Sequence, residues 1–137
     1  MTISRCSLLA LCGLCGLCAT RVAAQELPVT LPSGLAATLT ETRWEPQSAP
    51  VEIWVRFRFV VPGLAGADLD FDLVGADLAG LCRDVVLPAI AKAGKPADQA
   101  VISLSSEPIR FGETNPDVTQ VFEAYRVADG NCILEGF

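Results

Sequence analysis

Residues 51–61, VEIWVRFRFVV, are the part of the sequence that most narrows the choice of fold. Apolar residues occupy every second position of this run, and Trp54, Arg56 and Arg58 lie at positions between them. A period of two is typical of a β-strand that packs one face on a core and turns the other toward solvent. The run therefore predicts a strand with Trp54, Arg56 and Arg58 together on its outer face.

The first 24 residues have the pattern of a secretory signal peptide. A single early cation, Arg5, precedes an apolar stretch from Cys6 to Thr20, and the small residues Ala23 and Ala24 follow. This order of charge, apolar stretch and small-residue cleavage site is typical of exported proteins. The stretch is also short for a membrane span, which needs about 20 apolar residues. We expect cleavage after Ala24, a periplasmic or secreted protein, and no stable membrane span afterwards.

Three cysteines within this leader, Cys12, Cys15 and Cys18, have a spacing that also begins iron–sulfur motifs. Each follows a leucine and lies in the apolar stretch, rather than in loop backbone that could wrap a cluster. Cysteine is a small hydrophobic residue, so it can stand in for alanine in such a stretch. We therefore interpret these cysteines as part of the signal peptide.

The chain that remains after cleavage is acidic. It has 8 basic and 16 acidic residues and a net charge of about −8, which disfavours nucleic acid as a partner. The sequence contains no histidine, which excludes Ser-His and Cys-His nucleophile pairs and histidine metal ligands. It also lacks a phosphate-binding glycine loop. We expect no cofactor and no metal site.

Two cysteines remain in the mature chain, Cys82 and Cys132. Oxidising compartments allow disulfides to form and persist, so export predicts a Cys82–Cys132 bridge. The alternative is a pair of separate buried thiols.

The sequence predicts a single α+β domain over residues 35–137, after the signal peptide 1–24 and a lead-in of residues 25–34. The expected strands are residues 35–45, 51–61, 100–105, 118–127 and 132–137. Glu45 to Pro50 should break the chain between the first two strands, and Ile109 and Phe111 are candidates to extend the third.

A helix is expected after the second strand, because apolar residues recur at intervals of three and four from Phe71 to Ala89. Aspartates crowd its start, where the helix dipole favours them, and Pro88 should kink or end it. The order β-β-α-β-β-β predicts a small antiparallel sheet of about five strands with the helix on one face. An Asp129-Gly130 turn predicts that the last two strands form a hairpin.

Two groups of residues are candidates for a functional site. Trp54, Arg56 and Arg58 form a candidate binding face, although such arginines commonly pair with acids on neighbouring strands, and Glu41, Glu123 and Glu135 are available. Glu107, Glu113 and Asp117 lie in a loop and are the weaker, alternative candidates, as catalytic acids.

Four blocks of the sequence resemble a family of small exported alphaproteobacterial proteins of unknown function. These blocks are VEIWVRFRFVVP, DLAGLC, ISLSSEPIRFGE and FEAYRVADGNCILEGF, matching at Arg56–Phe59, Leu81-Cys82, Ile102–Gly112 and Phe122–Phe137. The resemblance covers most of the chain after the leader. It implies an exported protein and a type of fold, and it assigns no active site.

These observations favour a non-catalytic binding or envelope-accessory domain in the periplasm, with an envelope protein or a glycan as its partner. The alternative is a small carboxylate-dependent hydrolase, in which two of Glu107, Glu113 and Asp117 would lie about 5–10 Å apart. A third interpretation is a purely structural subunit with a broad apolar surface patch.

Overall fold

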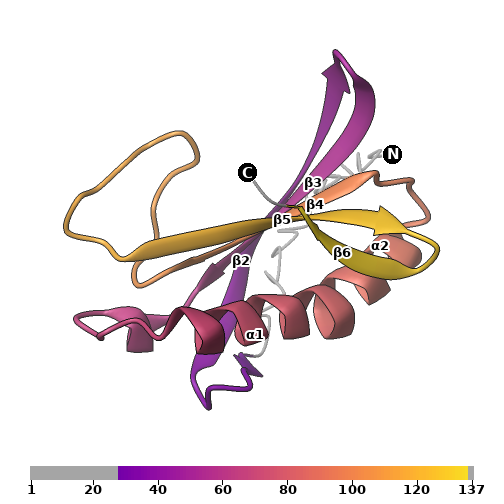
Figure 1. Cartoon of the computed structure of the whole chain (residues 1–137). Helices are drawn as coiled ribbons and strands as arrows, with labels where there is room; N and C mark the ends of the chain where they lie inside the picture. The colour runs from indigo at the N-terminus through magenta and orange to yellow at the C-terminus, as the bar shows by residue number, and fades with distance from the viewer. Residues whose placement is uncertain (1–27, 136–137) are drawn as a thin grey trace, which may run out of the picture.

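The computed structural model describes residues 28–135, which form a six-stranded sheet with one helical layer on one face (Figure 1). The α+β class is therefore confirmed. The predicted signal peptide lies outside the described residues. The elements in chain order are β1 Val29–Thr30, β2 Ala36–Ser48, β3 Val51–Val60, a short 3-10 turn Pro62–Leu64, α1 Phe71–Leu81, a π-helical segment Cys82–Val86, α2 Leu87–Ala93, β4 Gln99–Ser105, β5 Gln120–Ala128 and β6 Asn131–Glu135.

The six strands lie in the sheet in the order of the sequence, from β1 to β6. Neighbouring strands are antiparallel except β3 and β4, which are parallel. The prediction of an antiparallel sheet was wrong for this pair. The helical segment connects β3 to β4, and a connection that crosses one face of a sheet brings the next strand back in the same direction.

Strand β2 continues through Glu45 and Pro46 to Ser48, so the predicted break at Glu45 was wrong. Proline has no backbone N–H and is tolerated in a strand whose outer edge is unpaired. Pro46 pairs with Ile53 of β3 on one side, while β1 covers only Ala36 and Ala37 on the other. The chain turns instead at Ala49 and Pro50.

The helical segment begins at Phe71, where the Asp70 carboxylate accepts hydrogen bonds from the backbone N–H groups of Asp72 and Leu73. It runs through Pro88 to Ala93, so of the two predicted effects of this proline, a kink or an end of the helix, it does not end the helix. In the preceding π-helical segment the Leu87 N–H bonds to the Cys82 carbonyl, five residues earlier. The regular hydrogen-bond pattern of an α-helix is already interrupted there. The absence of a backbone N–H at Pro88 therefore destabilises the helix less than it would in a regular helix.

The core lies between the helical layer and one face of the sheet. Its largest fully buried side chains include Phe57 and Phe59 of β3, Leu78 and Leu81 of α1, and Ile102 and Leu104 of β4. Residues of the lead-in also contribute, because Leu31 is buried in this core and the Ser33 N–H donates to the buried Asp77 carboxylate at 2.8 Å. We call the opposite side of the sheet the open face.

Residues 106–119 form a loop between β4 and β5, which we call the β4–β5 loop. Ile109 and Phe111 belong to it, so the predicted extension of the strand was wrong. The loop is closed at its base, where the Ser106 N–H bonds to the Thr119 carbonyl and the Thr119 N–H bonds to the Ser106 hydroxyl.

The last two strands form the predicted hairpin. Asp129 and Gly130 both have positive φ, which two-residue turns of this kind require. The disulfide is also confirmed: Cys82, which is fully buried, is bonded to Cys132 of β6 with a Cα–Cα distance of 6.3 Å. The bond ties the final hairpin to the middle of the helical segment.

Replacing both cysteines (Cys82→Ala with Cys132→Ala) should lower the free energy of unfolding by about 4 kcal/mol, because the bond closes a loop of 50 residues in the unfolded chain. Urea unfolding of the oxidised protein and the double variant measures the difference. A reducing agent should destabilise the wild type and leave the variant unchanged. Equal stability of oxidised and reduced wild type would contradict this assignment.

Candidate functional site

Most of the charged side chains of the central strands lie on the open face of the sheet. Residues 55, 57 and 59 of β3 are buried in the core, so Trp54, Arg56 and Arg58 alternate onto the open face. Val101 and Ser103 of β4 pair with Arg56 and Arg58 in register and share that face. The predicted grouping of Trp54, Arg56 and Arg58 therefore exists in the structure.

Arginines and glutamates of β2 and β3 form a ladder across this face. Glu41 accepts hydrogen bonds from both Arg43, at 2.7 Å, and Arg58. Arg56 donates through Nε to Glu45, also at 2.7 Å. Pairing with Glu41 was anticipated from the sequence, but Glu45 was missed because it was predicted as the last residue of its strand, where the break begins.

The other two acids that were considered as arginine partners differ from each other. Glu135 of β6 pairs at 3.5 Å with Arg126 of β5, and not with Arg56 or Arg58, for which it was considered. Glu123 instead accepts a hydrogen bond from Tyr125, a buried residue of the core. Burial raises the pKa of Tyr125 well above its usual range, and the hydrogen bond to Glu123 raises it further.

Hydrogen bonds from Arg43 and Arg58 hold the pKa of Glu41 below its usual range. Glu41 is therefore ionised over the whole neutral range, and so are the arginines that it bridges. The ladder is a fixed pattern of charge rather than a proton-transfer site.

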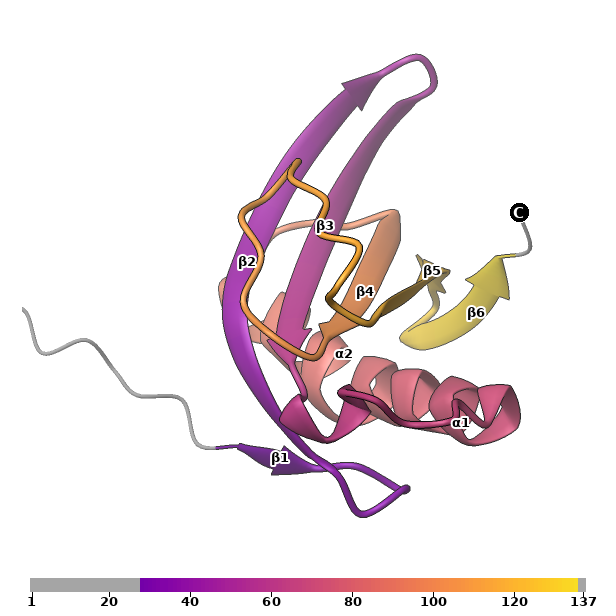
Figure 2. The same ribbon diagram turned by 90° about the vertical axis from the view of Figure 1, so that its left-hand side faces the viewer.

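The β4–β5 loop folds back over the open face, where it passes in front of β2 and β3 (Figure 2). The Arg58 guanidinium donates through Nη2 to the Ile109 carbonyl. The ring of Phe111 lies among three arginines, with its centroid 4.1 Å from Cζ of Arg43, 5.7 Å from that of Arg56 and 5.8 Å from that of Arg58. Cation–π attraction and one charged hydrogen bond thus hold this loop against the sheet.

Two hollows result, and they share Arg58, Arg110 and Phe111. The smaller, which we call the loop cleft, has a volume of about 160 Å³ and lies between the loop, β3, β4 and β5. The larger, which we call the β2 groove, has a volume of about 600 Å³ and reaches Thr40, Glu41 and Arg43 of β2.

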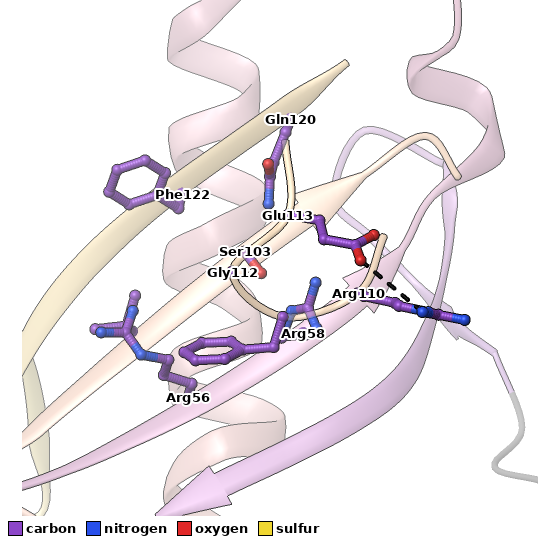
Figure 3. A pocket seen from close by; sticks show the side chains of 10 residues that line it. Arg56, Arg58, Ser103, Arg110, Gly112, Glu113, Gln120 and Phe122 are labelled. Atoms are coloured by element: carbon purple, nitrogen blue, oxygen red, sulfur yellow. Dashed lines mark ion pairs between the residues drawn. The ribbon is translucent and has the colours of Figure 1, made fainter. Parts of the chain in front are cut away.

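The loop cleft combines cationic, polar and aromatic groups (Figure 3). Arg56 and Phe122 lie at one end of it, and Arg110 and Glu113 lie at the other. Ser103 of β4 and Gln120 of β5 contribute a hydroxyl and an amide to the lining. Sequence reasoning missed Ser103, Arg110, Phe111 and Gln120. The only local signal was an aromatic residue, Phe111, in a loop that contains Pro108 and Gly112.

The three acids considered for catalysis are all exposed. Glu113 lines the loop cleft, where its carboxylate is 4.0 Å from Arg110. Glu107 and Asp117 line neither the loop cleft nor the β2 groove as the described residues form them. Of the three acids considered for catalysis, Glu113 alone therefore lines a hollow, with an arginine beside it, and this arrangement gives no specific support to a hydrolase that uses two of them.

Residues 14–137 match DUF6497, a family of unknown function. The chain belongs to this family. The match covers the whole open face and the β4–β5 loop of this DUF6497 protein, and it confirms the expected membership of an uncharacterised family. No curated protein and no solved structure gives a significant match. Within residues 28–135, none of the helices is long and apolar enough to cross a membrane.

Glu41→Gln should lower the free energy of unfolding at neutral pH by less than about 1 kcal/mol, because the ion pairs of Glu41 are partly open to solvent. The pKa of Glu41 in the folded protein lies below that in the unfolded chain. Its contribution is therefore complete above the unfolded pKa, and it is lost as the pH falls through the folded pKa. Urea unfolding from pH 7 to about pH 2 should show the difference between wild type and variant shrinking toward zero.

Glu107→Gln is the matched control, because Glu107 is exposed and has no ion pair with the described residues. Its stability should equal that of the wild type across the same pH range. A deficit of Glu41→Gln that persists unchanged in acid would contradict an electrostatic role for Glu41.

Proposed function

We propose that this chain is an exported protein-binding domain, and that its open face holds an acidic partner protein of the cell envelope at the loop cleft. The observation that carries the proposal is the gathering of arginines around Phe111. Residues 28–135 contain eight lysines and arginines, and four of them line the two hollows: Arg43, Arg56, Arg58 and Arg110. In a chain of net negative charge, this concentration favours an anionic ligand at one place.

The residue types on this surface favour a protein as the ligand. Arginine and aromatic residues are enriched at protein–protein interfaces, and buried aromatic and arginine anchors carry most of the binding energy. Phe111 and Phe122 are 45% and 57% exposed, and Trp54 lies on the same face. A standard interface covers about 800 Å² of each partner, which is more than the loop cleft alone could supply. The partner should therefore extend over the surrounding strands of the open face.

Two observations support export. The leader pattern of residues 1–24 favours secretion, and the disulfide between Cys82 and Cys132 is of a kind that persists in oxidising compartments. The periplasm or the exterior of the cell is therefore the proposed location, and an envelope protein is the proposed class of partner.

The test is photo-crosslinking in cells that express the full chain with its own leader. A photo-reactive residue placed at Glu113, in the loop cleft, should capture one protein. The same residue placed at Ala91, which is exposed on α2, should not capture it. Arg56→Glu should reduce capture from position 113 by about tenfold, the effect of one interface residue worth roughly 1.4 kcal/mol.

Arg83→Glu is the matched control. Arg83 is exposed in the π-helical segment, on the other side of the sheet, and it also pairs with an acid, Asp84. It should leave capture unchanged. Equal losses for the two variants, or capture from position 91 alone, would overturn the proposal.

A further inference from the structure

The size of the loop cleft limits what can enter it. Pockets that enclose a drug-sized ligand measure about 300–1,000 Å³, whereas the loop cleft measures about 160 Å³. The cleft can therefore take a side chain that projects from a larger partner, but it is too small for a whole ligand of ordinary size.

At one end of the loop cleft, several hydrogen-bond donors have no partner among the described residues. Arg58 is already bonded to Glu41 and to the Ile109 carbonyl. Arg56 donates its one hydrogen bond to the described residues through Nε, to Glu45, and its two Nη groups make none, although the guanidinium also lies over the rings of Trp54 and Phe111. The Ser103 hydroxyl and the Gln120 amide, which line the same cleft, likewise have no hydrogen bond to the described residues. These groups form a preorganised set of donors for an anion.

Part of the remaining lining suits an apolar group, while Arg110 and its ion-pair partner Glu113 form the other end of the cleft. Phe111 and Phe122 line it, and Val101 contributes to the lining from β4. A ligand that carries a carboxylate next to an apolar or aromatic group could thus satisfy the Arg56 Nη groups and cover the rings at the same time. Carboxylate–arginine contacts already occur within the chain on the open face. Glu41 of β2 binds Arg58, and Glu45 of β2 binds Arg56.

We infer that the loop cleft is a subsite for one glutamate or aspartate side chain of the partner, flanked by an apolar residue. This inference rests on the proposed function. The carboxylate binds the Arg56 Nη groups, with Ser103 and Gln120 as further donors, and the apolar neighbour packs on Phe111. Neither the family nor the sequence motifs assign this role to Ser103, Gln120 or Phe111.

The experiment is an NMR titration of the oxidised mature protein with short peptides as probes. Acetyl-Phe-Glu-amide should shift the Arg56 Nε–H, Ser103 and Gln120 signals. It should bind at least about fivefold more tightly than its neutral twin acetyl-Phe-Gln-amide. Raising the salt concentration should weaken the binding of the glutamate peptide and leave the binding of its neutral twin unchanged. Equal affinity of the two peptides would overturn the inference.

A carboxylate could come from a side chain or from the C-terminus of a chain. A third peptide, acetyl-Phe-Gln with a free terminal carboxylate, distinguishes these two sources. It should bind no better than the neutral twin, and tighter binding than the glutamate probe would assign the subsite to a chain terminus instead. Arg56→Gln should remove the preference for glutamate, whereas Arg126→Gln, the matched control, should preserve it. A preference that survives Arg56→Gln would also overturn the inference.

The two proposals fail separately. Capture of a partner through position 113, combined with equal binding of the glutamate and glutamine peptides, would retain the proposed function and reject the subsite. A glutamate preference without any captured protein would retain the chemistry of the subsite and reject an envelope protein as its source.

Discussion

The register of β3 is the constraint on which the rest of this structure depends. The strand is paired on both sides, with β2 and with β4, and its alternation sends Val55, Phe57 and Phe59 into the core. The same backbone necessarily places Arg56 and Arg58 on the open face. A shift of one residue would exchange the two sets and bury guanidinium groups against the helical layer, at a large desolvation cost. The packing of the core therefore determines the position of the candidate site.

Arg58 connects strand β3 to the β4–β5 loop. Its side chain is 15% exposed, and it joins three segments by bonding Glu41 of β2 and the Ile109 carbonyl of the loop. A guanidinium remains charged at all physiological pH values, so this connection does not depend on protonation. The loop has few buried apolar side chains of its own, and Val118 lies near its base. The loop cleft is thus held in place mainly by charge and by the contact of Phe111 with the arginines.

The features that local sequence specifies were predictable. The alternation of residues 51–61 predicted which side chains of β3 share a face, the Asp129-Gly130 pair predicted the final hairpin, and the two mature cysteines predicted the disulfide. The features that depend on distant partners were not. Pro46 is tolerated because of its place near a sheet edge, and the parallel pairing of β4 follows from the path of the helix. The contact of Arg58 with Ile109 joins residues 51 positions apart, which no local pattern records.

The most direct test of this account is the position of Phe111 in solution. In oxidised protein of residues 25–137, nuclear Overhauser effects between the Phe111 ring protons and the side-chain protons of Arg43 and Arg58 would show that the loop rests on the open face. We predict that both sets are present at neutral pH and that the effects between Phe111 and Arg43 are lost in Arg58→Ala, because the anchor of Ile109 is then removed. Their absence from the folded wild-type protein would contradict the loop cleft and the functions proposed for it.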